Sequence, residues 1–244
     1  MKEIKLSPSA LSLYDDCERC FWIKYNKKAK LPRGIFSSMP MGIDKLLKNY
    51  FDSHREKGTL PVELNGLDVK LFEDRTLLDR WRNNFRGIRF TDENNNTLFG
   101  AVDDIVVHEN RLVVVDYKTR GFPLKIDTHE RPTKQLAIYT YLLQKEGFQT
   151  EDFGYLLYWH PNLDQKVIDG KKETILSKSP YHIQSSEMQL LFHAEVVKVA
   201  LDLDEVVQRF NGAINILKEE MPKSSETCSQ CEYVNNMANL LGLS

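Results

Sequence analysis

The spacing of apolar and polar positions along the chain changes repeatedly between helical and strand periodicity. Stripes of apolar residues three and four apart predict helices, and runs of β-branched and aromatic residues predict strands. Helices are expected over residues 11–21, 40–58, 77–85, 134–146 and 202–222. Strands are expected over residues 88–91, 98–107, 112–119, 153–159 and 190–201. This order predicts an α/β protein.

Local signals fix several ends of these elements. Ser7 or Ser9 can cap the first helix, Pro40 suits the first turn of the second, and a glycine, Gly58, ends it. Asp202 or Asp204 can cap the last predicted helix, which ends near Pro222.

The unbroken Val113-Val114-Val115 run indicates a strand buried on both faces of a sheet. The helix over residues 134–146 separates this strand from the next, which predicts a crossover between parallel strands. We therefore expect a central mixed β-sheet flanked by helices. It would form a single domain over residues 1–244, with its core at about residues 34–201 and cysteine-bearing ends at 1–33 and 202–244.

Composition narrows the class of protein. The 244 residues are 41% hydrophobic and 28% charged, which excludes a disordered chain. No stretch approaches the roughly 18 apolar residues of a membrane span, and the start lacks a signal-peptide core, so a cytosolic location is expected.

The net charge of −2 gives no overall nucleic-acid signature, so a DNA contact requires a local basic patch. One candidate is a basic segment interleaved with aromatic residues, made of Lys24, Lys27, Lys28, Lys30 and Arg33. The alternative is an ordinary solvated basic face.

A predicted hairpin carries the candidate chemistry. If Glu109 and Asn110 are the central turn residues, Asp103 lies opposite Asp116, and Lys118 projects beside Asp116 on the same face. Two adjacent carboxylates repel each other unless a cation lies between them, and Mg²⁺ or Mn²⁺ suits such oxygen ligands. The set fits phosphodiester hydrolysis. The alternative is that Asp103, Asp104 and Lys118 are exposed residues on a partly solvated sheet, with Asp116 and Lys118 as a surface pair.

Four cysteines form two C-x-x-C pairs near opposite ends of the chain, Cys17/Cys20 and Cys228/Cys231. This spacing predicts a metal site or a cluster that ties the two ends together. Four thiolates suit either Zn²⁺ or a [4Fe–4S] cluster, and the spacing does not separate the two. A thioredoxin-like redox pair fits less well, because neither pair directly follows a strand in a βαβ unit.

The order of these motifs resembles a known family. Gly100-x-x-Asp103, the hairpin, Asp116-Tyr117-Lys118-Thr119 and Gln135-x-x-x-Tyr139 are similar to the nuclease domains of RecB, AddB and CRISPR-associated exonucleases in the PD-(D/E)XK superfamily. The likeness extends to Ser9-x-x-x-Leu13-Tyr14-x-x-Cys17 and to the C-terminal cysteines.

The resemblance implies a restriction-endonuclease-like core that cuts DNA with Mg²⁺ or Mn²⁺. It implies that Asp103, Asp116 and the Tyr117 carbonyl bind the metal and that Lys118 is the catalytic lysine. Gln135 and Tyr139 would approach the site and the DNA backbone.

Two features depart from the family's pattern. Many relatives supply a metal-binding histidine from the helix over residues 40–58, and here Asp44 is the nearest substitute, unless it only pairs with Lys48. The cysteines are split two and two, whereas iron–sulfur relatives place one early and three late. The resemblance still favours a [4Fe–4S] cluster over zinc.

The leading functional prediction is a metal-dependent DNA exonuclease that acts on single-stranded ends, in repair, recombination or mobile-element processing. Any helicase or recombination partner would be a separate chain, because the sequence has no Gly-rich phosphate loop. The alternatives are a DNA-binding or assembly subunit that does not cut, and a small redox or metal-sensing protein.

Overall fold

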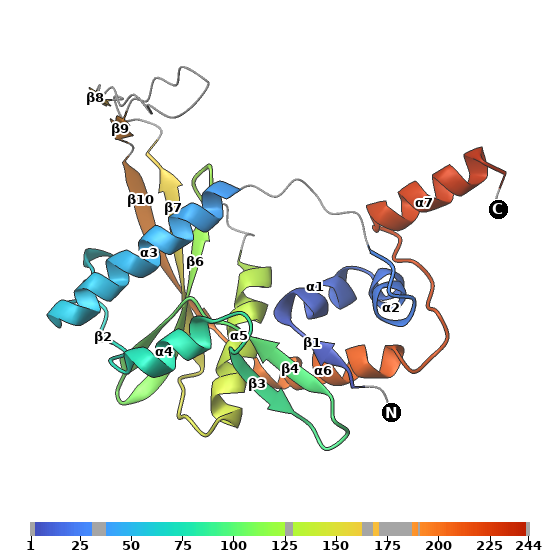
Figure 1. Cartoon of the computed structure of the whole chain (residues 1–244), viewed down its shortest axis with the longest axis horizontal. Coiled ribbons are helices and arrows are strands. Elements are labelled where there is room, and N and C mark those ends of the chain that lie inside the picture. The colour runs from blue at the N-terminus through green and yellow to red at the C-terminus, as the bar shows by residue number, and fades with distance from the viewer. Residues whose placement is uncertain are drawn as a thin grey trace, which may run out of the picture.

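The computed structural model (Figure 1) describes residues 3–30, 38–124, 129–162, 168–170, 187–189 and 191–242. The helices of these residues are α1 (Pro8–Asp16), α2 (Glu18–Asn26), α3 (Ser38–Lys57), the 3-10 turn η1 (Val62–Leu64), α4 (Arg75–Arg82), α5 (Glu130–Lys145), α6 (Leu203–Ile216) and α7 (Ser229–Leu240). The strands are β1 (Lys5–Leu6), β2 (Lys70–Leu71), β3 (Ile88–Thr91), β4 (Thr97–Gly100), β5 (Asp104–His108), β6 (Arg111–Thr119), β7 (Phe153–Pro161), β8 (Ile168–Gly170), β9 (Glu187–Gln189) and β10 (Phe192–Ala200). The mixed α/β prediction is confirmed.

A five-stranded mixed sheet with the order β10-β7-β6-β5-β2 forms the centre. β6 and β7 are parallel, as predicted for strands joined by the α5 crossover, and the other neighbouring pairs are antiparallel. The β5–β6 hairpin has the predicted register, with His108 opposite Arg111 and Asp104 opposite Val115. Glu109 and Asn110 form its turn with positive φ angles of 45° and 64°, which a tight hairpin turn requires.

Hydrophobic cores cover both faces of this sheet. Val114 and Leu156 point into the core that α5, α6 and α1 complete, whereas Val113 and Val115 pack on the other face with Leu47 of α3 and its neighbours. In Figure 1, α3 crosses the central strands, and α1, α2 and α6 lie together on the other side of the molecule. The prediction of burial on both faces is therefore confirmed.

The single strand expected over residues 98–107 is wrong, because two strands in different sheets replace it. β4 pairs with β1 and β3 in a separate three-stranded sheet, whereas β5 joins the central one. Gly100 ends the first strand against the ring of Tyr139. Asp104 begins the second strand; it is fully buried and forms ion pairs with Arg55 and Arg82. The turn between them contains Asp103.

Two helix predictions also need correction. The helix expected over residues 11–21 is broken at Cys17, whose extended backbone (φ −164°, ψ 108°) ends α1 and begins α2. This break lets the Cys17 side chain turn toward the other cysteines. The helix near residues 77–85 ends at Arg82, and Phe85 lies outside it with 92% of its surface exposed.

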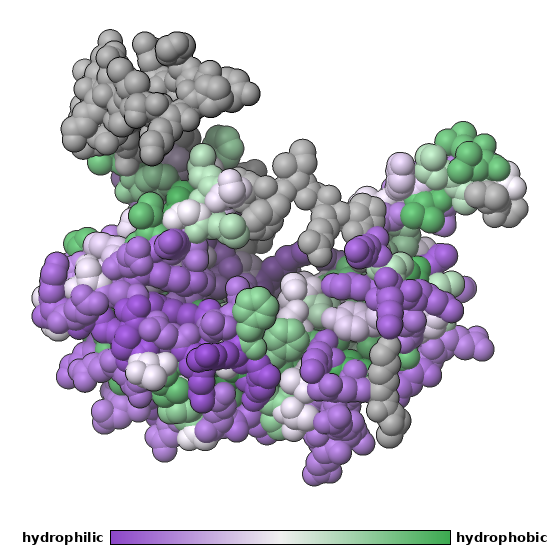
Figure 2. All heavy atoms as spheres, viewed as in Figure 1, coloured by the Kyte–Doolittle hydropathy of each residue, from purple (hydrophilic) through white to green (hydrophobic). Residues whose placement is uncertain are grey.

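The helix that Asp202 caps, α6, was expected to be the last, but α7 follows it. α7 projects from the body in Figure 1, and Figure 2 shows apolar surface along it. Tyr233, Val234, Leu240 and Leu241 are all more than half exposed there. Among the described residues, no helix is both long and apolar enough to cross a membrane.

Candidate active site

Asp103 and Asp116 lie at the end of the β5–β6 hairpin that is far from its turn. Asp116 is in β6, and Asp103 precedes β5 by one residue, just beyond the regular ladder. The backbone N–H of Tyr117 donates to Asp103 Oδ2 at 3.0 Å. The two carboxylates are therefore neighbours, as the hairpin register requires.

Asp116 is a buried carboxylate in a strongly perturbed environment. Only 1% of its surface is exposed. Burial raises the pKa of Asp116 to about 7, opposed by the ammonium of Lys118 and assisted by the charge of Asp103. Its Oδ2 lies 2.5 Å from Lys118 Nζ but has no hydrogen-bond partner of acceptable geometry. A buried carboxylate oxygen without such a partner is suited to hold a cation.

Lys118 begins a chain of polar contacts that ends in the core. Its Nζ donates to Gln135 Oε1 at 3.0 Å, and Gln135 Nε2 donates to the Tyr139 hydroxyl at 2.7 Å. The three side chains come together because Lys118 shares its strand face with Asp116, while Gln135 and Tyr139 are one helical turn apart on α5. Burial raises the pKa of Tyr139 well above its usual value, so its hydroxyl stays protonated.

Helix α3 supplies Asp44 and Lys48 to the other side of Asp103. Lys48 Nζ lies 2.9 Å from Asp103 Oδ1 and 2.9 Å from Asp44 Oδ2. Burial opposes the charge on Lys48, but Asp103 and Asp44 outweigh it and raise the lysine's pKa. Asp44 therefore pairs with Lys48, which also binds Asp103.

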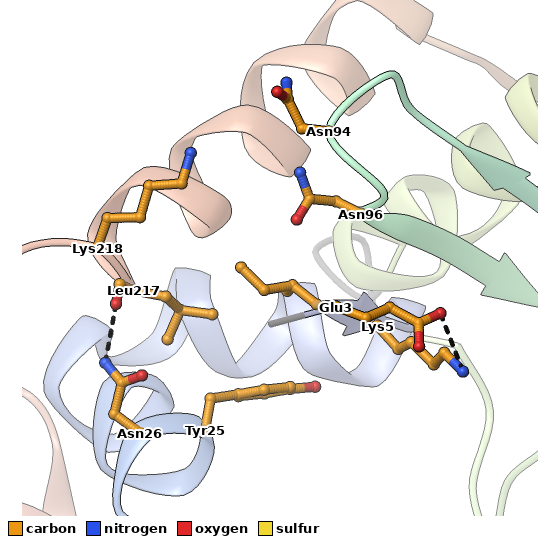
Figure 3. Close-up of a pocket in the computed structure, with 9 residues that line it drawn as sticks. Glu3, Lys5, Tyr25, Asn26, Asn94, Asn96, Leu217 and Lys218 are labelled. Atoms are coloured by element: carbon orange, nitrogen blue, oxygen red, sulfur yellow. Dashed lines mark hydrogen bonds and ion pairs between the residues drawn. The ribbon is translucent and has the colours of Figure 1, made fainter. Parts of the chain in front are cut away.

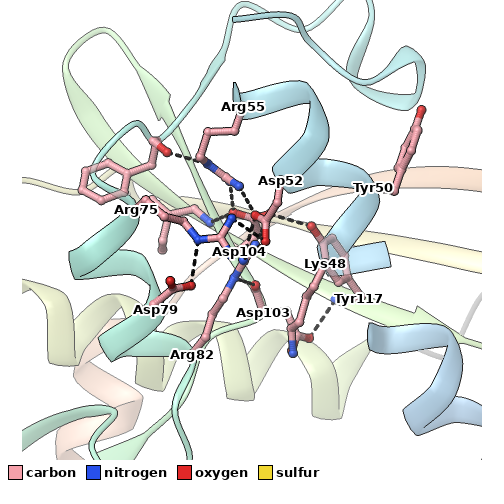
Figure 4. Close-up of polar contacts among 12 residues, drawn as sticks. Lys48, Tyr50, Asp52, Arg55, Arg75, Asp79, Arg82, Asp103, Asp104 and Tyr117 are labelled. Carbon is pink, nitrogen blue, oxygen red and sulfur yellow. Dashed lines mark hydrogen bonds and ion pairs between the residues drawn. The ribbon is translucent and has the colours of Figure 1, made fainter. Parts of the chain in front are cut away.

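A buried network of aspartates and arginines supports the site from below (Figure 4). Asp104 accepts from Arg55 Nη2 at 2.6 Å and from Arg82 Nη2 at 2.8 Å, and the hydroxyl of Tyr117 donates to it at 2.6 Å. Arg82 also binds Asp52 and donates from Nε to the backbone carbonyl of Asp103 at 2.7 Å. The network therefore holds the turn that presents the Asp103 carboxylate.

This network is absent from the sequence prediction. Asp52 and Arg55 are three residues apart on one helix, which is a local signal for an ion pair. Arg82 lies in a different helix, and its contacts with Asp52 and Asp104 span 30 and 22 residues of chain. No local spacing indicates such contacts.

A shallow groove of about 460 Å³ lies beside Lys118 and Gln135, between α1 and the start of α5. Ser9, Ser12 and Arg131 also line it. The groove is open, and Lys118 lies in its wall.

The four cysteines meet as predicted, although more than 200 residues separate the two pairs. Cys20 Sγ lies 3.5 Å from Cys231 Sγ and 3.6 Å from Cys228 Sγ, and Cys17 Sγ lies 3.8 Å from Cys231 Sγ. Burial disfavours the thiolate of Cys17, but backbone N–H groups of Ser225 and Cys20 lower its pKa to about 7. The four sulfur atoms can hold a metal ion or a cluster.

The basic segment follows the first cysteine pair in the sequence. Lys24, Lys27, Lys28 and Lys30 are exposed on α2 and beyond its end, whereas Arg33 lies outside the described residues. Lys27 Nζ lies 5.5 Å from the Trp22 ring centre, and the Trp22 indole donates to the Glu219 carbonyl at 3.0 Å. The lysines thus form a solvent-facing basic surface near the cysteine cluster.

A separate hollow of about 440 Å³ lies between the N-terminal strand and α2 (Figure 3). Tyr25 and Leu217 line it, and two of its three charged residues, Glu3 and Lys5, pair with each other at 3.1 Å. It shares no residue with the groove beside Lys118. We therefore do not assign it to the candidate site.

Comparison with known proteins supports the hypothesis that the motif order suggested. The sequence model of a family described as "PD-(D/E)XK nuclease superfamily" matches residues 5–235 of this chain. No curated protein matches the sequence. One similar solved structure, titled "Crystal structure of SSO0001", is 14% identical and has a TM-score of 0.39, covering 88% of this chain and 78% of that one.

Proposed function

Because the chain belongs to the PD-(D/E)XK nuclease superfamily, we propose that it is a metal-dependent DNA nuclease with its active site at Asp103, Asp116 and Lys118. The observation that carries the proposal is the buried Asp116 carboxylate beside Asp103, whose Oδ2 contacts the Lys118 ammonium but has no hydrogen bond of acceptable geometry. Two neighbouring carboxylates share a proton or require compensating positive charge, and a divalent cation would add to the charge that Lys118 and Lys48 supply.

The residues present fit a divalent cation with oxygen ligands. Asp103, Asp116 and the backbone carbonyl of Tyr117 would hold Mg²⁺ or Mn²⁺, which take carboxylate and carbonyl oxygens. When bound, such an ion activates water and stabilises the charge that develops on a phosphate.

The remaining side chains supply position and charge. Gln135 holds Lys118 beside Asp116, where its ammonium would stabilise charge on a reacting phosphate. Tyr139 holds Gln135 in turn through a hydroxyl that remains protonated. Asp44 lies next to the site, but its carboxylate binds Lys48, so we do not propose it as a direct metal ligand.

We propose an exonuclease of the RecB, AddB and CRISPR-associated type, which acts on DNA with single-stranded ends. The open groove beside Lys118 would receive the strand, and the exposed lysines beyond it would bind phosphates. Such an enzyme would work in repair, recombination or mobile-element processing, with any helicase on a separate chain.

For the cysteine site we propose a single Zn²⁺ ion in preference to a [4Fe–4S] cluster. A tetrahedral Zn²⁺ with Zn–S bonds of about 2.3 Å places its sulfur ligands about 3.8 Å apart. The contacts of 3.5 to 3.8 Å between Sγ atoms agree with that spacing. An iron–sulfur cube places an iron atom before each thiolate, which spreads the four sulfur atoms much farther apart.

The proposed exonuclease activity is tested with matched linear and circular single-stranded DNA of the same sequence. The protein is incubated with Mg²⁺ or Mn²⁺, and linear substrates carry a label at one end or the other. We expect stepwise loss of linear DNA from one end, with circles left intact. Cutting of circles would indicate an endonuclease. Tight binding to both substrates without cutting would favour the assembly-subunit alternative.

A further inference from the structure

Lys48 holds an unusual place for a lysine in this site. Its Nζ lies 2.9 Å from Asp103 Oδ1 and 2.9 Å from Asp44 Oδ2, so one ammonium bridges carboxylates of two elements. The side chain is only 23% exposed, and Figure 4 shows it reaching from α3 toward Asp103. Lys45, on the same helix, is exposed to solvent.

The contacts of Asp103 leave little room for cations on the α3 side. Its Oδ2 accepts from the backbone of Tyr117, and its Oδ1 accepts from Lys48. A carboxylate oxygen has two lone pairs, so one ion between Asp103 and Asp116 is still accommodated. A second divalent ion that bridged Asp103 and Asp44 would have to displace the ammonium.

The charge balance points the same way. The carboxylates of Asp44, Asp103 and Asp116 carry three negative charges, and the ammonium groups of Lys48 and Lys118 carry two positive ones. One divalent ion brings the site from −1 to +1, whereas two would bring it to +3 with the lysines in place. The arginine network below adds no free negative charge, because its aspartates are already paired.

We propose that the ammonium of Lys48 takes the place of a second divalent cation, so that this nuclease works with a single metal ion. The inference rests on the proposed function of the site. It assigns Lys48 the role of a positioning residue, which orients Asp103 toward the single ion and supplies the positive charge that a second ion would otherwise bring.

The test counts bound Mn²⁺ in the full chain with its cysteine site filled. Free Mn²⁺ is measured by its electron paramagnetic resonance signal, and binding that survives in Asp116→Asn is subtracted as background. We expect one Mn²⁺ for the wild type and two for Lys48→Glu, which replaces the ammonium with a third carboxylate facing Asp103. Lys45→Glu makes the same charge change on the same helix and should leave the count at one.

Lys48→Gln is the second variant, in case the glutamate prevents folding. It frees Asp44 and Asp103 from their common partner, and we expect a second, weaker Mn²⁺ to bind. Two ions on the wild type, or a single ion on both Lys48 variants, would overturn the inference while leaving the proposed nuclease intact. No Mn²⁺ above background on the folded wild type would instead refute the metal site itself, and the inference with it.

Discussion

Gly100 is the position where a single added carbon atom should damage both the fold and the site. A Cβ built on Gly100 would lie 2.5 Å from Cε1 and 2.9 Å from Cδ1 of Tyr139. Carbon atoms in contact prefer about 3.5–4.0 Å. The Gly100→Ala variant must therefore move the Tyr139 ring by roughly 1 Å. Only 5% of the surface of Tyr139 is exposed, so the ring lies in a closed core.

The expected magnitude follows from the packing around that ring. Forcing an extra carbon into a closed core costs about 1–3 kcal/mol. Movement of Tyr139 also disturbs its 2.7 Å bond to Gln135, which positions Lys118. A shift of about 1 Å in a positioning group can lower a rate by about a hundredfold. We therefore expect losses of both stability and activity.

Urea unfolding and the rate of DNA cutting, measured on the same preparations, test this reasoning. Gly121→Ala is the matched control, because a Cβ there meets no atom within 4 Å. In a double-mutant cycle, truncating Tyr139 to Leu should relieve most of the cost of Gly100→Ala, since the two sites compete for one space. Wild-type stability and rate in Gly100→Ala would refute the proposed coupling between this glycine and the active site.

Three further predictions concern the surroundings of the site. Arg82→Met removes a partner of the buried Asp52 and Asp104 and should lower the free energy of unfolding by about 3–5 kcal/mol. Its control is Asp79→Asn, in an exposed ion pair on the same helix, which should cost less than about 1 kcal/mol. Equal losses in urea titrations would contradict this prediction. Cys231→Ser should remove the proposed zinc ion and lower the melting temperature, and unchanged metal content by elemental analysis would count against the site. Replacing Lys24 and Lys27 with Gln should weaken binding of single-stranded DNA in EDTA and reduce the slope of log affinity against log salt by about 1.4. An unchanged slope would mean that these lysines face solvent only.

Local signals were sufficient to predict the chemistry-bearing hairpin. The Glu109-Asn110 turn sets the register that brings Asp103 to Asp116, and the observed ladder has that register. Helical spacing likewise placed Gln135 and Tyr139 on one face of α5, where they contact each other. Such features depend on neighbours within one strand or one helical turn, which a sequence records directly.

Contacts between distant elements could not be predicted in the same way. The break at residues 101–103 depends on Asp104 finding two arginines from other helices. Lys48 was recognised as a partner of Asp44 one turn away, but its contact with Asp103 spans 55 residues and requires α3 to lie across the sheet. The helix break at Cys17 likewise depends on cysteines at the other end of the chain.

We propose above all that Asp116 and its neighbours hydrolyse DNA with a divalent metal ion. The most direct measurement compares Mn²⁺-dependent release of short products from single-stranded DNA by the wild type and by Asp116→Asn, which keeps the side chain's shape and removes its charge. We predict metal-dependent cutting by the wild type and a loss of about a hundredfold or more in the variant. Equal cutting by folded samples of both proteins, or none by metal-loaded wild type, would contradict the account.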